Sequence, residues 1–156
     1  MSTPYEETLE GKLLVRQAPG ERHERVCSRL HELVSASLDG LRSATLLAPR
    51  SRIAVAPVTA VCPDLALIAT ATGRLWLAAE VIHGGDHHAD TVLKKQIYED
   101  LRLPRLWMLD TRYDNVEVYH AGPYGLSLKS ILAGGEILSE QLLPEFQVSI
   151  RALFAA

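Results

Sequence analysis

Two acidic residues, Asp64 and Glu80, interrupt parts of the sequence that otherwise have the composition of buried strands. Leu65 to Ala71 and Leu75 to Val81 are apolar runs of strand length, separated by a short Ala-Thr-Gly turn. If they pair as a hairpin centred on Thr72, Asp64 faces Glu80, and opposed side chains have Cβ atoms about 4.5 to 5.5 Å apart. Two carboxylates at this separation repel each other unless a positive charge lies between them. The spacing therefore predicts a cation site.

A divalent metal ion is the natural candidate for that cation. Mg²⁺ prefers oxygen ligands and is often held by only one or two carboxylates, while water and substrate phosphate fill its other positions. The alternative is that both acids lie at strand ends in water, as most acidic residues do. The same register places Ala66 opposite Ala78 and Ile68 opposite Trp76.

A helix predicted over residues 89–101 adds a lysine. One apolar stripe recurs along it: Ala89, Leu93, Ile97 and Leu101, widened by Val92. Asp90, Lys94 and Tyr98 form a second row beside this stripe, which can point toward the acidic end of the hairpin. Alternatively, Asp90 and Lys94 form an ordinary surface pair worth a few tenths of a kcal/mol.

The run from His83 to His88 reads His-Gly-Gly-Asp-His-His, an unusual composition directly after the second apolar run. Imidazoles together with a carboxylate suit Zn²⁺, Mn²⁺ or Fe²⁺. His83 lies only three residues beyond Glu80, so it can reach an ion held there. The alternative is a glycine-rich turn in which Asp86 caps the following helix and the histidines are exposed.

A longer pattern includes these positions. It consists of the Pro-Asp pair at 63–64, the Glu-Val-Ile triplet at 80–82, and the residues Asp90, Lys94, Tyr98, Pro104, Trp107 and Asp110. In residue type and spacing this resembles a bacterial family of uncharacterised proteins described as putative restriction endonucleases, in the PD-(D/E)XK nuclease superfamily. The resemblance covers Pro63 to about Tyr119 well and extends more weakly from about Tyr5 to Phe154.

The resemblance implies an α/β fold of the restriction-endonuclease-like type, with a central mixed β-sheet flanked by helices, in a single domain over residues 1–156. It implies a metal-dependent endonuclease that hydrolyses DNA, with Mg²⁺ or Mn²⁺ at Asp64 and Glu80 and His83 as a further ligand candidate. The superfamily lysine usually lies two residues after the acid, where this chain has Ile82. Members of this family carry the lysine on the helix instead, which favours Lys94 as the catalytic lysine.

Two features depart from the family pattern or leave it open. The family's Ser-Pro-Ser-Thr loop is replaced here by the His-Gly-Gly-Asp sequence at 83–86. Superfamily members often draw a further acid from the first helix, predicted here from Glu21 to Leu38, so that Glu21 and Glu24 are candidates. A solvated charged face is the alternative explanation for both.

The remaining pattern predicts several further strands. They are expected at Lys12–Arg16, Thr45–Leu47, Ile53–Val58, Leu106–Leu109, Asn115–His120 and Tyr124–Ile131. The clean alternation of Asn115–His120 is typical of an edge strand. The apolar tail from Leu142 to Phe154 is expected to pack on the core, which should contain Ile68, Trp76, Leu93 and Ile97.

Length and composition indicate one globular domain and the cellular environment in which it folds. With 156 residues, 47% of them hydrophobic, the chain can form one core. Its two cysteines suggest no metal spacing or disulfide framework and fit a reducing cytoplasm. Residues 1–10 are polar and acidic, which argues against a signal peptide, and the longest uncharged apolar stretch, Ile53 to Pro63, is too short to span a bilayer.

The net charge of −3 and pI near 6.1 count against strong nonspecific binding of nucleic acid, which depends on Lys and Arg neutralising phosphates. The net charge does not exclude a local basic groove. Its candidate residues are Arg42, Arg50, Arg52, Arg74, Lys94 and Lys95.

Three hypotheses of different classes follow. The first is the DNA endonuclease, expected as a homodimer because enzymes that cut both strands commonly act as symmetric dimers, and because the strand at Val116–Tyr119 and the apolar tail offer an uncovered surface. The second is a nucleic-acid-binding or partner-binding module that keeps the nuclease fold without cleavage. The third is a histidine-assisted metal protein.

Overall fold

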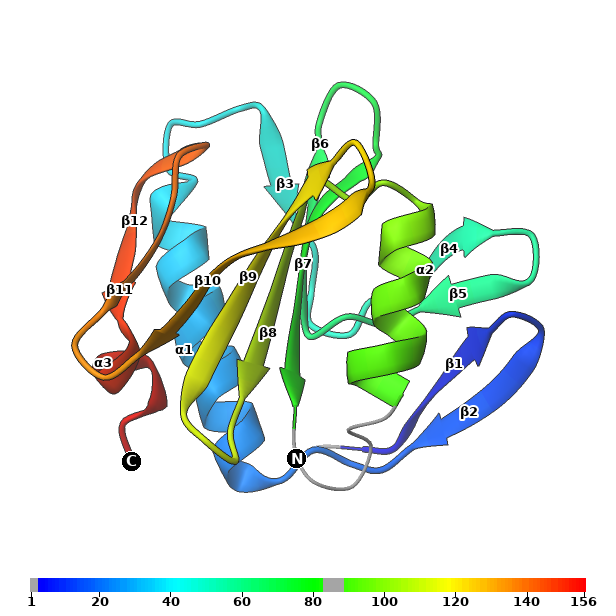
Figure 1. Ribbon diagram of the computed structural model, residues 1–156, viewed down its shortest axis with the longest axis horizontal. Helices are drawn as coiled ribbons and strands as arrows, with labels where there is room; N and C mark the ends of the chain where they lie inside the picture. Colours follow the sequence, from blue (N-terminus) through cyan, green and yellow to red (C-terminus); the bar gives the residue numbers. More distant parts are fainter. Residues whose placement is uncertain (1–2, 83–88) are drawn as a thin grey trace.

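A six-stranded mixed sheet forms the centre of the structure, a computed structural model that describes residues 3–82 and 89–156 (Figure 1). Its strand order is β10-β9-β8-β7-β6-β3. The strands are β3 (Ala44–Leu46), β6 (Leu65–Ala69), β7 (Leu75–Ile82), β8 (Arg105–Asp110), β9 (Asn115–Gly122) and β10 (Gly125–Ala133). β7 and β8 pair in parallel, while the other neighbours in this sheet pair antiparallel. The parallel pair requires a crossover, and the helical segment between the two strands supplies it.

One face of the sheet packs against α1 (Glu21–Ser37), which lies behind the strands in Figure 1. The core on this side also contains side chains of the tail, which forms β11 (Ile137–Glu140), β12 (Leu143–Ser149) and α3 (Ile150–Phe154). Trp107 of β8 stacks on Phe146 of β12 with ring centroids 5.4 Å apart. The prediction that the apolar tail packs on the core is therefore confirmed.

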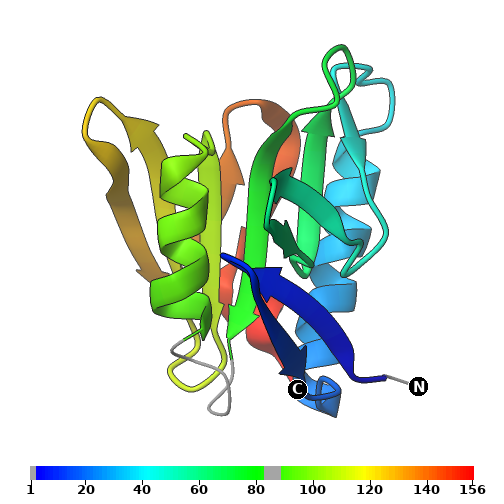
Figure 2. The same ribbon diagram turned by 90° about the vertical axis from the view of Figure 1, so that its right-hand side faces the viewer.

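The other face packs against the crossover, which consists of the π-helical segment η1 (Ala89–Lys94) and α2 (Lys95–Asp100). A second, antiparallel sheet adjoins this side and faces the viewer in Figure 2. Its strand order is β2-β1-β5-β4, with β2 (Lys12–Arg16), β1 (Tyr5–Leu9), β5 (Thr59–Val61) and β4 (Ile53–Ala56). The sequence pattern missed β1 and β5, and it extended β4 to Val58.

The central hairpin has the predicted register over most of its length. Leu65 pairs with Ala79, Ala66 with Ala78, and Leu67 with Leu77. A bulge then shifts the pairing, because one extra residue of β7, Trp76, is inserted before the turn, so that Ile68 pairs with Leu75. The predicted pairing of Ile68 with Trp76 is therefore wrong, and both side chains are half-buried instead of lying in the core.

The helical crossover buries a different face from the one that its apolar stripe predicted. Leu93 is 42% exposed, whereas Asp90, Lys94 and Tyr98 are buried and Ile97 lies in the core as expected. The predicted burial of Leu93 is therefore wrong. The polar row is buried because charged partners on other elements compensate it, and a helical pattern alone contains no information about them.

The position of β9 also differs from the prediction. It lies between β8 and β10, so it is an interior strand, and β10 forms the edge of the sheet. Its alternation arises because Val116 and Val118 face the core under α1 and Tyr119 faces the core under α2. Within the described part of the chain, no helix has both the length and the apolar character needed to cross a membrane.

Candidate active site

Glu80 and Asp64 lie at the end of the central hairpin where β6 begins and β7 ends. Ala78 and Ile82, two residues to either side of Glu80 on β7, belong to the core under α2, which places Glu80 on that face because strand side chains alternate. Asp64 immediately precedes β6, and its Oδ2 accepts a hydrogen bond from the Val81 amide at 2.8 Å. Both carboxylic acids are only 2% exposed. The structure therefore brings these two predicted residues together on adjoining strands.

Asp64 is surrounded by hydrogen-bond donors. His23 Nε2 of α1 lies 2.9 Å from Oδ1, and Arg50 Nη1 donates to the same oxygen at 3.1 Å. Burial alone would raise the pKa of Asp64, but the hydrogen bond and charge of His23, the Val81 amide and the charge of Lys94 lower it to about 2. Asp64 is thus an ionised carboxylate at neutral pH.

Glu80 contacts the polar row of the helical crossover. Its Oε2 lies 2.7 Å from Lys94 Nζ and accepts a hydrogen bond from the Tyr98 hydroxyl at 2.6 Å. Burial raises the pKa of Glu80 to about 8; Lys94 opposes this shift, and the nearby acids Asp90, Asp64 and Glu7 add to it. Burial lowers the pKa of Lys94, but Glu80 and its neighbouring acids raise it well above the usual value.

Glu7 of β1 is a buried acid that the sequence analysis did not identify. Its Oε2 lies 2.6 Å from Lys94 Nζ and accepts a hydrogen bond from the Cys62 amide at 2.6 Å, while its Oε1 lies 2.5 Å from Arg16 Nη1. Arg16 Nη2 in turn donates to both carboxylate oxygens of Asp90 at 2.9 Å. One clue in the sequence is an arginine in the neighbouring strand of the same N-terminal hairpin, although its pairing with Glu7 depends on the fold.

The structure also places the other candidate residues. Glu21 is exposed, and Glu24 pairs with Arg50, which itself contacts Asp64. Lys95 lies over the Tyr119 ring, 4.8 Å from its centroid, whereas Lys94 contacts the buried acids, so Lys94 is the lysine that the fold places beside Glu80. His83 and the rest of the loop at 83–88 lie outside the described residues.

Several candidate residues of the predicted basic groove make contacts within the protein. Arg50 and Lys94 contact the buried acids, and Arg52 hydrogen-bonds to the backbone of Glu6 and the side chain of Thr8. Arg74 lies in the turn between β6 and β7, at the opposite end of the hairpin from Asp64. Most of these basic side chains therefore serve intramolecular contacts.

Carboxylate oxygens near Lys94 are the type of ligand that a hard cation such as Mg²⁺ prefers. Within residues 3–82 and 89–156, no group of three or more His, Cys, Asp and Glu side chains is arranged to hold a metal ion. Mg²⁺ commonly needs only one or two protein carboxylates, however, and Asp64 and Glu80 offer that number. The Lys94 ammonium lies 2.6 Å from Glu7 and 2.7 Å from Glu80, so the surroundings of Glu80 accommodate a positive charge. The residues present therefore fit such an ion.

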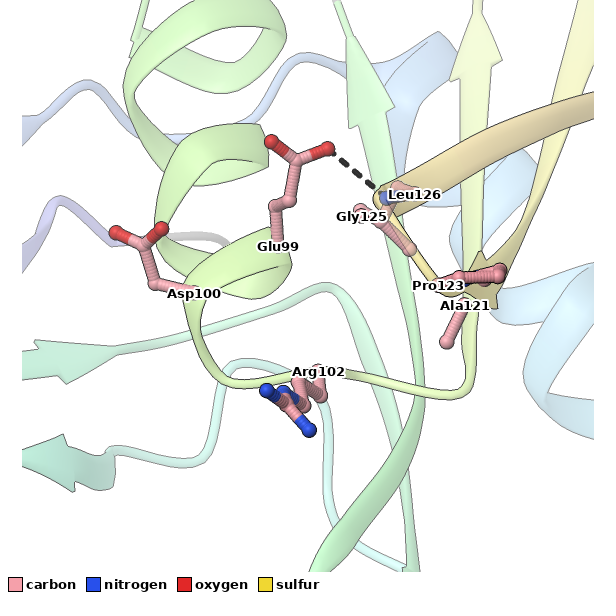
Figure 3. Close-up of a pocket in the computed structure, with 8 residues that line it drawn as sticks. Glu99, Asp100, Arg102, Ala121, Pro123, Gly125 and Leu126 are labelled. Atoms are coloured by element: carbon pink, nitrogen blue, oxygen red, sulfur yellow. Dashed lines mark hydrogen bonds between the residues drawn. The ribbon is translucent and has the colours of Figure 1, made fainter.

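The cavity drawn in Figure 3 is a separate feature. It has a volume of about 300 Å³ and lies between the end of α2 and the turn joining β9 to β10. Glu99 Oε2 accepts a hydrogen bond from the Leu126 amide at 2.9 Å across this region. Asp64, Glu80 and Lys94 do not line this cavity, so it is not the candidate active site.

Together, the mixed sheet and the buried Asp, Glu and Lys side chains define a protein of the restriction-endonuclease-like class. The profile of the Uma2 family, described as "Putative restriction endonuclease", matches residues 2–151, and the chain belongs to that family. A crystal structure of a putative nuclease belonging to DUF820 from Anabaena variabilis ATCC 29413 superposes with a TM-score of 0.81 at 15% sequence identity, covering 97% of this chain and 90% of the other. This likeness confirms the predicted fold class. No curated protein matches the chain.

Proposed function

We propose that the protein is a metal-dependent endonuclease that hydrolyses phosphodiester bonds of DNA. The observation that carries the proposal is the contact of Lys94 with Glu80, at 2.7 Å, at the end of the central hairpin where Asp64, whose pKa is lowered, precedes β6. Membership of a family described as a restriction endonuclease family supports the same reaction class.

Each residue has a distinct role in this proposal. Asp64 and Glu80 would hold Mg²⁺ or Mn²⁺, with His83 as a further candidate ligand. A bound ion would lower the pKa of a water molecule and neutralise phosphate charge. The Lys94 ammonium would stabilise the negative charge that develops on the phosphate, as a preorganised charge does in a site that excludes water. Tyr98 fixes the orientation of Glu80 through its hydroxyl.

The test uses the metal as a reporter. An ion that binds only the folded state raises the melting temperature by mass action, so Mn²⁺ or Mg²⁺ should stabilise the wild type. The same preparation should cleave plasmid or oligonucleotide DNA. A wild type that binds the ion but cleaves no DNA with either ion would contradict the endonuclease proposal.

A second candidate function is a binding module that keeps the fold without cleavage. The observation in its favour is that Glu80 is 2% exposed and Lys94 is 0% exposed, so neither can touch a phosphodiester unless the surrounding structure moves. The net charge of −3 fits the same reading. Binding of DNA or a protein partner by a wild type that shows no cleavage would favour this candidate.

A homodimer with twofold symmetry is part of the endonuclease proposal. β10 pairs with the edge of β9 that was predicted to be uncovered, and β10 is itself the edge strand, on which Leu128 is 47% and Ile131 is 54% exposed. Light scattering at micromolar concentration should give twice the chain mass of 17.2 kDa. A mass of one chain would contradict the dimer.

A further inference from the structure

Glu7 is held more tightly than a carboxylate at the end of a flexible side chain usually is. It is completely buried on β1, in the N-terminal hairpin that adjoins the face of the sheet covered by α2 (Figure 2). Its Oε1 contacts Arg16, and its Oε2 contacts both Lys94 and the Cys62 amide. Three groups, from β2, from η1 and from the segment after β5, therefore fix both oxygens.

Arg16 extends this arrangement back to the helical crossover. Its guanidinium contacts Glu7 through Nη1 and both oxygens of Asp90 through Nη2. Asp90 lies four residues before Lys94, at the start of η1. The β1–β2 hairpin is thus fastened to the segment that carries the lysine at two places, through Arg16 and through Glu7.

Lys94 needs such a support. A lysine carries a compact charge on a flexible stem of four carbons, and it ordinarily extends toward water. Here the ammonium lies between two carboxylates, 2.6 Å from Glu7 and 2.7 Å from Glu80. Without Glu7, Glu80 would be left as the closest carboxylate to a lysine that is 0% exposed.

We propose that Glu7 is a positioning residue that holds the Lys94 ammonium beside Glu80 in the geometry that the reaction requires. The inference rests on the proposed endonuclease function and adds the N-terminal hairpin to the active site. A purely stabilising role is a weaker explanation, because replacing a buried ion pair by apolar side chains of similar volume is often neutral or stabilising. Glu7 acts through the lysine, since both of its oxygens are already occupied by groups of the protein.

The test is a double-mutant cycle on cleavage of a DNA oligonucleotide in Mn²⁺, with the variants Glu7→Gln, Lys94→Met and the pair together. Glu7→Gln should lower kcat by about tenfold or more, while KM and the Mn²⁺ concentration that gives half of the thermal shift stay unchanged. In the Lys94→Met background the same change should cause no further loss, because a residue that acts through another has no effect once that one is gone. Glu7→Asp, which keeps the charge, should recover part of the rate.

The matched control is Glu6→Gln, since Glu6 is the neighbouring acid on the same strand and its side chain is exposed. It should retain the wild-type kcat. If Glu7→Gln does not fold, Glu7→Asp in the wild-type and Lys94→Met backgrounds gives the same cycle.

Three results would overturn the inference, and they are distinguishable. Equal loss in both backgrounds would make Glu7 independent of Lys94, and loss of Mn²⁺ binding in Glu7→Gln would make it a metal ligand. Unchanged kcat in Glu7→Gln would leave it a structural residue. A wild type that cleaves no DNA would remove the proposed function itself, and this inference with it.

Discussion

Asp64 and Glu80 are two buried carboxylic acids on adjoining strands, and they differ in the groups around them. Asp64 has three donors, from His23, Arg50 and the Val81 amide. Glu80 has Lys94 and Tyr98 as donors, but three other acids raise its pKa. The pKa of Asp64 is lowered to about 2 and that of Glu80 is raised to about 8. Such divergence between paired titratable groups commonly accompanies a division of roles in an active site.

The two strand ends therefore differ in the charge state that the protein favours at each carboxyl group. Asp64 is a permanent negative charge whose orientation the protein fixes. The pKa of Glu80 is raised by burial and by the nearby acids, and Lys94 opposes this rise, so a change at the lysine must also change the pKa of Glu80. Substitutions near Asp64 and near Glu80 should therefore have different effects on cleavage, metal binding and stability.

The largest effect is expected on cleavage at the Glu80 side. Lys94→Ala should reduce kcat by about 10²-fold to 10³-fold, the range found when one preorganised charge-stabilising group is removed. It should leave most of the Mn²⁺-induced rise in melting temperature. Glu80→Ala, in contrast, should abolish both cleavage and that rise. Steady-state kinetics and thermal shift on the same preparations provide the measurement. Equal loss of Mn²⁺ binding in the two variants would contradict the prediction that Lys94 acts in cleavage and not in metal binding.

A large effect on stability is expected where the ion pairs are buried. Arg16→Met leaves Glu7 and Asp90 without their shared guanidinium and should cost about 3 to 5 kcal/mol, as breaking a buried pair does. Arg112→Met, which removes an ion pair with Asp110 at the surface, should leave the free energy of unfolding nearly unchanged. Urea denaturation of both variants checks the contrast. A small cost for Arg16→Met would mean that the buried network is replaceable.

The pH dependence of stability should have opposite signs on the two sides. Asp64 has a lower pKa in the folded state than its usual 3.8, so its contribution is present above that value and is lost as the pH falls toward 2. Glu80 has a folded pKa of about 8 against a usual 4.5, so the folded state keeps a proton that the unfolded state releases. Its contribution is therefore full below pH 4.5 and is lost as the pH rises toward 8. Urea denaturation of the metal-free protein across this range should show the decline, and Glu80→Gln should flatten it. A decline of the same slope in Glu80→Gln would assign it to another group.

The smallest effect is expected at His83, on the loop that follows Glu80. His83→Ala should weaken Mn²⁺ binding, but less than Glu80→Ala does, if the imidazole only supplements the carboxylates. Thermal shift with Mn²⁺, Zn²⁺ and Mg²⁺ gives the comparison. A loss equal to that in Glu80→Ala, confined to Mn²⁺ and Zn²⁺, would favour a histidine-assisted transition-metal protein.

The sequence by itself determined the parts of the site that depend on local periodicity. The hairpin register predicted Asp64 opposite Glu80, and the four-residue spacing of Asp90, Lys94 and Tyr98 put these three residues on one side of the crossover. The strands of the central hairpin and α1 were predictable for the same reason. Each of these depends on residues close together in the chain.

The packing of separate elements determines which side of the crossover is buried and which acids surround the lysine. An apolar stripe predicts burial of Leu93, yet Leu93 is exposed, because Glu7, Arg16 and Glu80 from distant elements compensate the charges of Asp90 and Lys94. Burial of a charge is tolerable only where a partner is present, and that partner is supplied by the packing of separate elements. For the same reason Glu7, on a strand that the sequence pattern missed, became part of the site only when β1 packed beside Lys94.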